Sequence, residues 1–83
     1  MKNVFKNIDK YVGKKVRVCT EQSPVKPTTI HIHKIMDDPL HSGIKDYDLI
    51  IYRILCKTYW KWYVVNRTVL YLYNSLYEQE KKS

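Results

Sequence analysis

Alternation of apolar and polar residues is the feature that most restricts the fold of this sequence. Residues 15–20 read Lys-Val-Arg-Val-Cys-Thr, and Ile30 and Ile32 alternate with His31 and His33. Side chains that alternate with a period of two lie on opposite faces of a β-strand. We therefore predict strands over residues 14–21 and 28–36, each with one apolar and one polar face, joined by a proline-containing loop at 22–27.

The second half of the chain contains three more strand-like segments. Residues 47–57 fit a strand or a buried helix, and their β-branched and aromatic side chains favour the strand. This strand would place Ile50 and Tyr52 on one face and Ile51 and Arg53 on the other. Residues 60–66 would return after a turn near Lys57, and residues 69–73 alternate again.

Helical patterns occur near both ends. In residues 3–13 the apolar side chains recur at the spacing of one helical face, and Gly13 suits the end of a helix. Asn74 is a candidate N-cap for a helical segment at 75–82. The sequence thus predicts a single small domain over residues 1–83 of the α+β, β-rich class: a short N-terminal helix, about five short antiparallel strands and a short C-terminal helical tail.

The five strands could form a small SH3-like or OB-like barrel or an open sheet. Closure into a barrel would remove the edges that such apolar strands otherwise leave exposed. For that reason we favour the barrel.

The charge of the chain indicates the sign of its partner. Fifteen Lys and Arg residues oppose eight acidic residues, which gives a net charge of +7. A field of that sign attracts phosphate-rich or acidic partners. The alternative is a charge that is spread over the whole surface and serves solubility.

Several classes of protein are disfavoured. No run approaches the roughly 18 apolar residues of a membrane span, and no apolar segment typical of a secretory signal follows Met1. We therefore expect a cytoplasmic protein without a membrane partner. Its two cysteines, Cys19 and Cys56, should be reduced in that compartment.

Candidate catalytic and metal-binding groups are few. His31 and His33 share a strand face, and Cys19 or a carboxylate such as Asp38 could complete a zinc site. The chain has no recognised spacing of metal ligands, and its two glycines do not make a phosphate-binding loop. We expect no metal, no cofactor and no catalytic activity.

The aromatic stretch at residues 58–65, Thr-Tyr-Trp-Lys-Trp-Tyr-Val-Val, carries the functional hypothesis. On a strand, Trp60 and Trp62 share one face with Val64, and we predict this face to be core. The other face mixes Tyr and Lys, as single-strand binders do, because Tyr stacks on bases and Lys contacts phosphates. We expect a non-catalytic domain that binds nucleic acid, possible contact residues being Lys15, Arg17, Arg53, Tyr59, Lys61, Tyr63 and Arg67.

Two other interpretations remain open. Tyr, Trp and Arg are also enriched in protein–protein interfaces, so the chain could be a small phage-type inhibitor or adaptor. Its partner would then be a larger protein that has an acidic surface or is associated with nucleic acid. The third interpretation is a homodimer formed through the apolar, uncharged strand predicted at residues 69–73.

Overall fold

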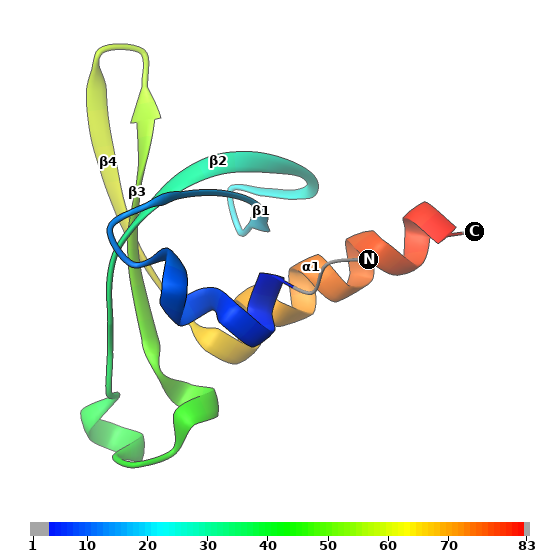
Figure 1. Ribbon diagram of the computed structural model, residues 1–83. Helices are drawn as coiled ribbons and strands as arrows, with labels where there is room; N and C mark the ends of the chain where they lie inside the picture. Colours follow the sequence, from blue (N-terminus) through cyan, green and yellow to red (C-terminus); the bar gives the residue numbers. More distant parts are fainter. Residues whose placement is uncertain (1–3, 83) are drawn as a thin grey trace.

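The computed structural model describes residues 4–82, and side chains within residues 8–80. Four strands occupy the middle of the chain, and helical segments precede, interrupt and follow them (Figure 1). In chain order the elements are η1 (Val4–Tyr11), β1 (Lys15–Thr20), β2 (Ser23–Met36), η2 (Pro39–His41), η3 (Lys45–Tyr47), β3 (Leu49–Cys56), β4 (Tyr59–Asn66) and α1 (Arg67–Lys82).

The strands form one antiparallel sheet in the order β1-β2-β3-β4, so each strand pairs with its neighbours in the sequence. β1 and β4 are the two edges and do not pair with each other. The sheet is therefore open, so the open-sheet alternative and the α+β, strand-rich class are confirmed, whereas the favoured barrel is wrong. η1 and α1 lie on the same side of the sheet (Figure 1). We call that side the inner face and the opposite side the outer face.

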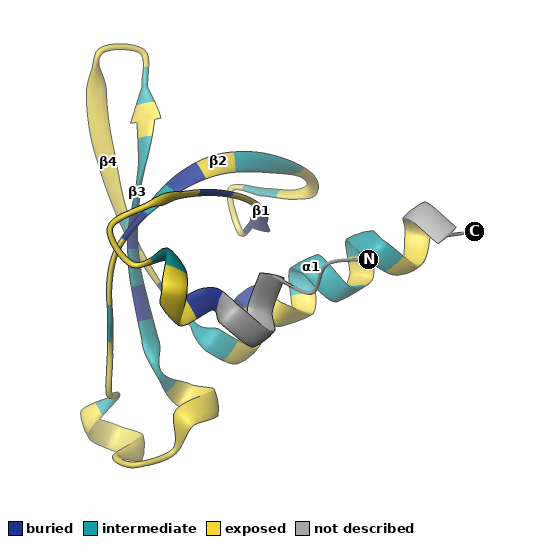
Figure 2. Ribbon diagram, in the orientation of Figure 1, coloured by how far each residue is buried: buried dark blue, intermediate teal, exposed yellow. Residues whose placement is uncertain are grey.

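The hydrophobic core lies between the inner face and these two helices (Figure 2). Ile30 and Ile32 of β2 and Ile50 and Tyr52 of β3 are at most 1% exposed, and Leu70 of α1 is fully buried. The predicted partition of β3 is confirmed, since Ile50 and Tyr52 face the core. Other members of this core are Ile8, Val16, Val18 and Val65.

The fifth predicted strand is wrong, because residues 69–73 belong to α1. The side chain of Asn66 accepts a hydrogen bond from the Val69 amide at 2.9 Å and so caps the helix that begins at Arg67. Leu70, Asn74 and Tyr77 then follow at the spacing of one helical face. The C-terminal helix is longer than the predicted tail at 75–82. Within residues 4–82, no helix combines the length and the apolar character needed to cross a membrane.

The expected N-terminal helix does not form as an α-helix. Residues Val4–Tyr11 are a 3₁₀ helix, in which residues three apart lie above one another; Ile8 is fully buried and Tyr11 packs against the core. Gly13 then takes a φ of +80°, and its amide donates to the Ile32 carbonyl at 2.7 Å. This contact ties the end of η1 to β2.

The predicted loop at 22–27 is also wrong, because β2 begins at Ser23 and runs through Pro24 and Pro27. Prolines lack the amide that a sheet ladder requires, so they occur in strands where one side is unpaired. β2 pairs with β1 at Ser23 and then over residues 28–31, and its pairing with β3 begins only at His31. Pro24 and Pro27 therefore lie outside both ladders, where the missing amide costs no sheet hydrogen bond.

An irregularity in the pairing of β1 with β2 is the place where α1 is bonded to the sheet. The register between β1 and β2 shifts between Val18 and Thr20, which takes Cys19 out of the ladder. The side chain of Asn74 replaces the missing partner: its Oδ1 accepts from the Cys19 amide at 2.8 Å, and its Nδ2 donates to the Cys19 carbonyl at 2.9 Å. Asn74 thus holds the middle of α1 on β1, and its predicted role as an N-cap is wrong.

Candidate functional site

The two tryptophans of the chain lie on the outer face, which reverses the predicted use of β4. Trp60, Trp62 and Val64 are 37%, 51% and 59% exposed, while Val65 is buried and Tyr63 packs against the core. The register causes this arrangement: Val65 lies opposite Ile50, whose side chain is in the core, so Trp62 and Val64 must point the other way. The prediction that the tryptophan face is core is therefore wrong.

Five side chains from three strands form one group on this face, which we call the Trp–Arg–His cluster: His31, His33, Arg53, Trp60 and Trp62. The guanidinium carbon of Arg53 lies 4.4 Å from the ring centre of Trp60 and 5.4 Å from that of Trp62. The rings of His31 and Trp60 are 4.7 Å apart, those of His33 and Trp62 are 5.1 Å apart, and both pairs are nearly perpendicular. Cation–π attraction thus holds Arg53 against the indoles.

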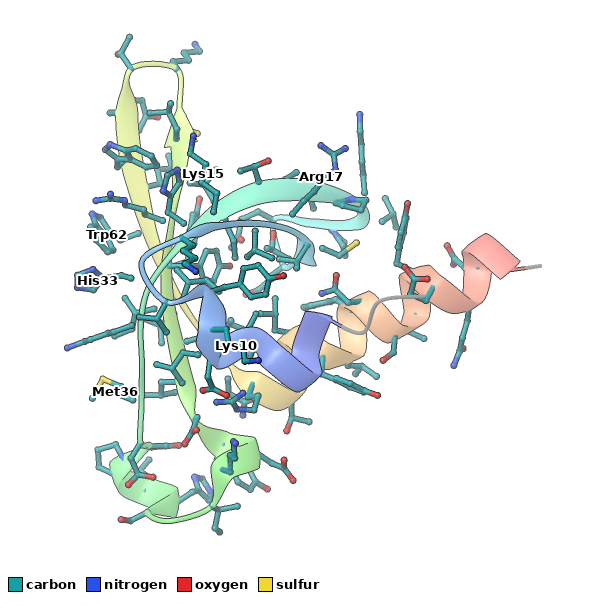
Figure 3. The ribbon with its side chains drawn as sticks, viewed as in Figure 1. Lys10, Lys15, Arg17, His33, Met36 and Trp62 are labelled. Carbon is teal, nitrogen blue, oxygen red and sulfur yellow. The ribbon has the colours of Figure 1, made fainter. Side chains whose placement is uncertain are left out.

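The register also aligns one residue from each strand across the sheet. Lys15 lies opposite His31, His31 opposite Arg53, and Arg53 opposite Trp62. We call these four residues, Lys15, His31, Arg53 and Trp62, the transverse row. Neighbouring strands are about 4.8 Å apart, so the row spans about 14 Å from β1 to β4. Trp62 and His33 point away from the helices, and Lys15 lies near the crossing of β1 with the other strands (Figure 3).

The sheet is free of carboxylates. None of the eight acidic residues of the chain lies in β1, β2, β3 or β4, which together contain six Lys and Arg residues. Lys15 and Arg17 alternate with the buried Val16 and Val18, and Lys34 lies opposite Ile51 on the outer side of β3. The outer face is consequently positive and aromatic, with no acidic group on its strands.

His31 is a partly buried titratable group between two basic residues of the outer face. Desolvation, together with the positive charges of Lys15 and Arg53, lowers the pKa of its imidazole below the ordinary value. His31 is therefore neutral at pH 7, and its uncharged ring can contact flat ligands. A nearby phosphate would favour the protonated ring.

The residues considered for a metal site do not come together. Cys19 is buried beside α1, whereas His31 and His33 contact the indoles on the other side of the sheet. Asp38 accepts hydrogen bonds from the Leu40 amide and the His41 ring, both at 3.0 Å. In the described part of the chain no group of three or more His, Cys, Asp or Glu residues is placed to hold a metal ion.

The structure divides the predicted contact residues into three sets. Lys15, Arg17 and Arg53 lie on the outer face, Arg17 where β1 and β2 curve away from the indoles (Figure 3). Tyr59, Lys61 and Tyr63 lie on the inner side, where Tyr63 stacks on Tyr52 and the Lys61 ammonium is 5.9 Å from the Tyr59 ring. Arg67 is remote from both sets.

The side chain of Arg67 is held within the fold by two carboxylates. Its side chain is 11% exposed and contacts Asp9 of η1 at 2.9 Å and Asp48, which precedes β3, at 3.1 Å. The hydrogen bond that Arg67 donates to Asp9 lowers the pKa of the Asp9 carboxyl group. A guanidinium that is held by two carboxylates is poorly suited to contact a phosphate.

Sequence reasoning missed His31, His33, Trp60 and Trp62 as members of one surface. A signal was present, because His31-Ile32-His33 and Trp60-Lys61-Trp62 both repeat an aromatic ring with a period of two. The alternation shows that each pair shares a face. It does not show that the two faces are the same, because that depends on strand register.

The opposite end of the outer face is mostly aliphatic, with Lys34 of β2 as its one basic residue among the described strands. Val64 lies opposite Ile51, and Met36 and Leu49 form the last pair between β2 and β3. Met36 and Val64 are 38% and 59% exposed. The Trp–Arg–His cluster is therefore continuous with an aliphatic area, which we call the aliphatic end. It is formed by Met36, Leu49, Ile51 and Val64.

No protein-family model matches the chain, and comparisons with curated proteins and with solved structures likewise found no match.

Proposed function

We propose that this chain is a non-catalytic binding domain that engages nucleic acid through the outer face of its sheet. The observation that carries the proposal is the Trp–Arg–His cluster, in which two exposed indoles and a guanidinium are grouped on strands without a carboxylate. Nucleic acid offers the complementary groups, since phosphates attract Lys and Arg while bases stack on aromatic rings. We expect this function in the cytoplasm, where the free thiols of Cys19 and Cys56 stay reduced.

Each residue of the outer face has a separate role in this proposal. Lys15, Arg17 and Lys34 contact phosphates, Arg53 contacts a phosphate or a base, and the two indoles stack. Tyr59, Lys61 and Tyr63 have no direct role, because they lie on the inner side. Arg67 supports the fold.

The test is a titration of fluorescein-labelled oligonucleotides, followed by fluorescence anisotropy at several salt concentrations. Neutralising about four phosphates gives a log–log slope of about −3 against salt, so affinity should fall about 20-fold between about 50 and about 150 mM salt. Absence of binding even at the lowest salt would contradict the proposal.

A second candidate function is docking on a larger protein, as a small inhibitor or adaptor would do. The aliphatic end favours it, because exposed Met and Val beside Trp and Arg resemble the composition of a protein interface. Val64→Lys separates the two functions. The added charge should strengthen nucleic-acid binding and abolish docking of an apolar protein surface.

The readout for this second candidate is the capture of a protein from a lysate by immobilised wild-type chain and by the Val64→Lys variant. A protein that the wild type captures and the variant does not would favour docking. If Val64→Lys weakens oligonucleotide binding, the aliphatic end itself contacts the nucleic acid, and the docking interpretation loses its main support.

A further inference from the structure

We propose that the nucleic acid is single-stranded and crosses the sheet along the transverse row, with unpaired bases on Trp60 and Trp62 and its backbone running toward Lys15. This inference rests on the proposed function. It adds that the nucleic acid is single-stranded, which way it crosses the sheet, and which of its parts contacts each end of the transverse row. It is carried by the exposure of the indoles, the position of Arg53 and the register of the four strands.

Arg53 indicates that a flat group fits beside the indoles. A guanidinium is planar, and here it lies over both tryptophan rings, at 4.4 and 5.4 Å from their centres. Trp60 and Trp62 are two positions apart on β4, so their Cα atoms are about 7 Å apart, which is twice a normal contact distance. A base can take the place of the guanidinium, and Arg53 can then turn toward a phosphate.

A duplex does not offer free base faces on which these indoles could stack. Paired bases are stacked on each other and present only their edges in the grooves. The outer face is also too broad to enter a groove, since the transverse row alone spans about 14 Å against a major groove of about 12 Å. The β3–β4 hairpin is narrow enough to enter, but its indoles lie on the broad face with β2 beside them.

The charges determine how the strand lies on the sheet. Lys15 is at the β1 end of the transverse row, and Arg17 lies beyond it on the same strand. Trp62 is at the β4 end, and Arg53 and His31 lie between. The base-stacking groups are thus concentrated at one edge of the sheet and the ammonium group at the other, so the backbone runs from the indoles across β3 and β2.

The experiment compares one mixed-sequence DNA strand of about 20 nucleotides with its duplex, a length above the usual site sizes of single-strand binders. Intrinsic fluorescence reports directly on this face, because both tryptophans of the chain belong to the cluster. We expect the single strand to bind at least tenfold more tightly than the duplex, with quenching of the indole fluorescence.

Three variants test the contacts. Trp60→Val and Trp62→Val remove a stacking ring but keep strand propensity, and each should weaken single-strand binding about 5- to 150-fold. Arg53→Gln should weaken binding and make the log–log salt slope about 0.7 less steep, as the loss of one phosphate contact requires.

Tyr59→Val is the matched control. Tyr59 is 52% exposed, adjacent in sequence to Trp60 and on the inner side of the same strand. Its replacement should change affinity less than twofold. Circular dichroism on all four variants checks that the sheet is retained.

The outcomes separate the two proposals. Duplex binding that equals or exceeds single-strand binding, without quenching, would overturn the single-strand inference and leave the proposed function intact. The inference is also overturned if either tryptophan variant binds like Tyr59→Val, or if Arg53→Gln binds more tightly than the wild type. Failure of both oligonucleotides to bind at low salt would remove the proposed function together with the inference.

Discussion

Tyr52 is a buried polar residue at the centre of the core. It is 1% exposed, and its hydroxyl group donates to the side chain of Gln22 at 2.8 Å, which satisfies the polar atom without opening the core to water. Its ring stacks on Tyr63 of β4 at 5.5 Å. Burial, with the negative charge of Glu21 as a smaller cause, raises the pKa of Tyr52 to about 12.

This pKa predicts a loss of stability at alkaline pH. In the unfolded chain Tyr ionises near pH 10, so between pH 10 and 12 the folded state retains a proton that the unfolded state has lost. Stability is therefore complete below pH 10 and falls by about 1.4 kcal/mol per pH unit from this group up to pH 12. Tyr52→Phe should be about 1 kcal/mol less stable at pH 7, because it loses the hydrogen bond.

The measurement is urea unfolding of both proteins at pH 8, 10 and 11. The difference in unfolding free energy between wild type and Tyr52→Phe cancels the other titrating groups. It should fall as the pH rises above 10 and change sign by about pH 11. A constant difference would show that Tyr52 ionises equally in both states.

The β3–β4 hairpin is the element that presents the cluster. Its last pair is Cys56 and Tyr59, so Lys57 and Thr58 form a two-residue loop. Lys57 has a φ of +57°, the one positive φ among the described non-glycine residues. A positive φ at the first loop position alone is typical of a type II′ turn, in which Gly is preferred there. The predicted turn near Lys57 is present, but lysine is an unfavourable residue type at the first loop position of such a turn.

Lys57→Gly should therefore stabilise the chain by about 0.5–1 kcal/mol. Removal of the steric cost of a left-handed residue, about 1–2 kcal/mol, outweighs the greater entropy of Gly in the unfolded state. Thr58→Gly is the matched control and should be destabilising, because Thr58 does not have a positive φ. Denaturant midpoints measure both effects. Equal midpoints for the two variants would mean that Lys57 is not strained.

At the scale of the whole molecule, acidic and basic residues occupy different parts of the fold. The acidic residues lie in the helical segments, turns and C-terminal helix, while the sheet contains only basic charges. Arg67 joins three of these parts, since it begins α1 and contacts Asp9 of η1 and Asp48 before β3. Its backbone amide also donates to the Asp48 carbonyl at 2.9 Å. Asp9 and Asp48 thus connect η1, α1 and the start of β3 through Arg67, and the strands of the outer face carry no acidic residue.

Arg67→Met should lower the unfolding free energy by about 2 kcal/mol at pH 7. Most of this comes from Asp48, since Asp9 is half exposed and solvent screens its contact with Arg67. The bond to Arg67 lowers the pKa of Asp9, so its contribution is present above the unfolded pKa of about 4 and is lost as the pH falls through the folded value.

Thermal melts at pH 7 and pH 3 check this prediction. The difference in melting temperature between wild type and Arg67→Met should be smaller at pH 3. Arg17→Met, which replaces an exposed arginine of the outer face, controls for the loss of one positive charge. An equal effect of the two substitutions would contradict the role of Arg67.

Local patterns predicted β1, β3 and β4 and several of their faces. The alternation over residues 15–20, a strand within residues 47–57 with Ile50 and Tyr52 on one face, and the turn near Lys57 are all present in the structure. So does the basic outer side of β1. These features are predictable because they depend on a period of two within a few residues, and β-branched residues favour the extended backbone.

Only the tertiary structure decided which side of β4 is covered and whether residues 69–73 are a strand. Both sides of β4 carry large apolar residues, so the choice depends on pairing of Val65 with Ile50 and on the position of α1 over that side. Residues 69–73 also alternate, but the local Asn66 cap permits a helix, and the burial of Leu70 and the bonds from Asn74 to Cys19 favour it. Contacts between residues far apart in the chain made these choices, because the local pattern fits either outcome equally well.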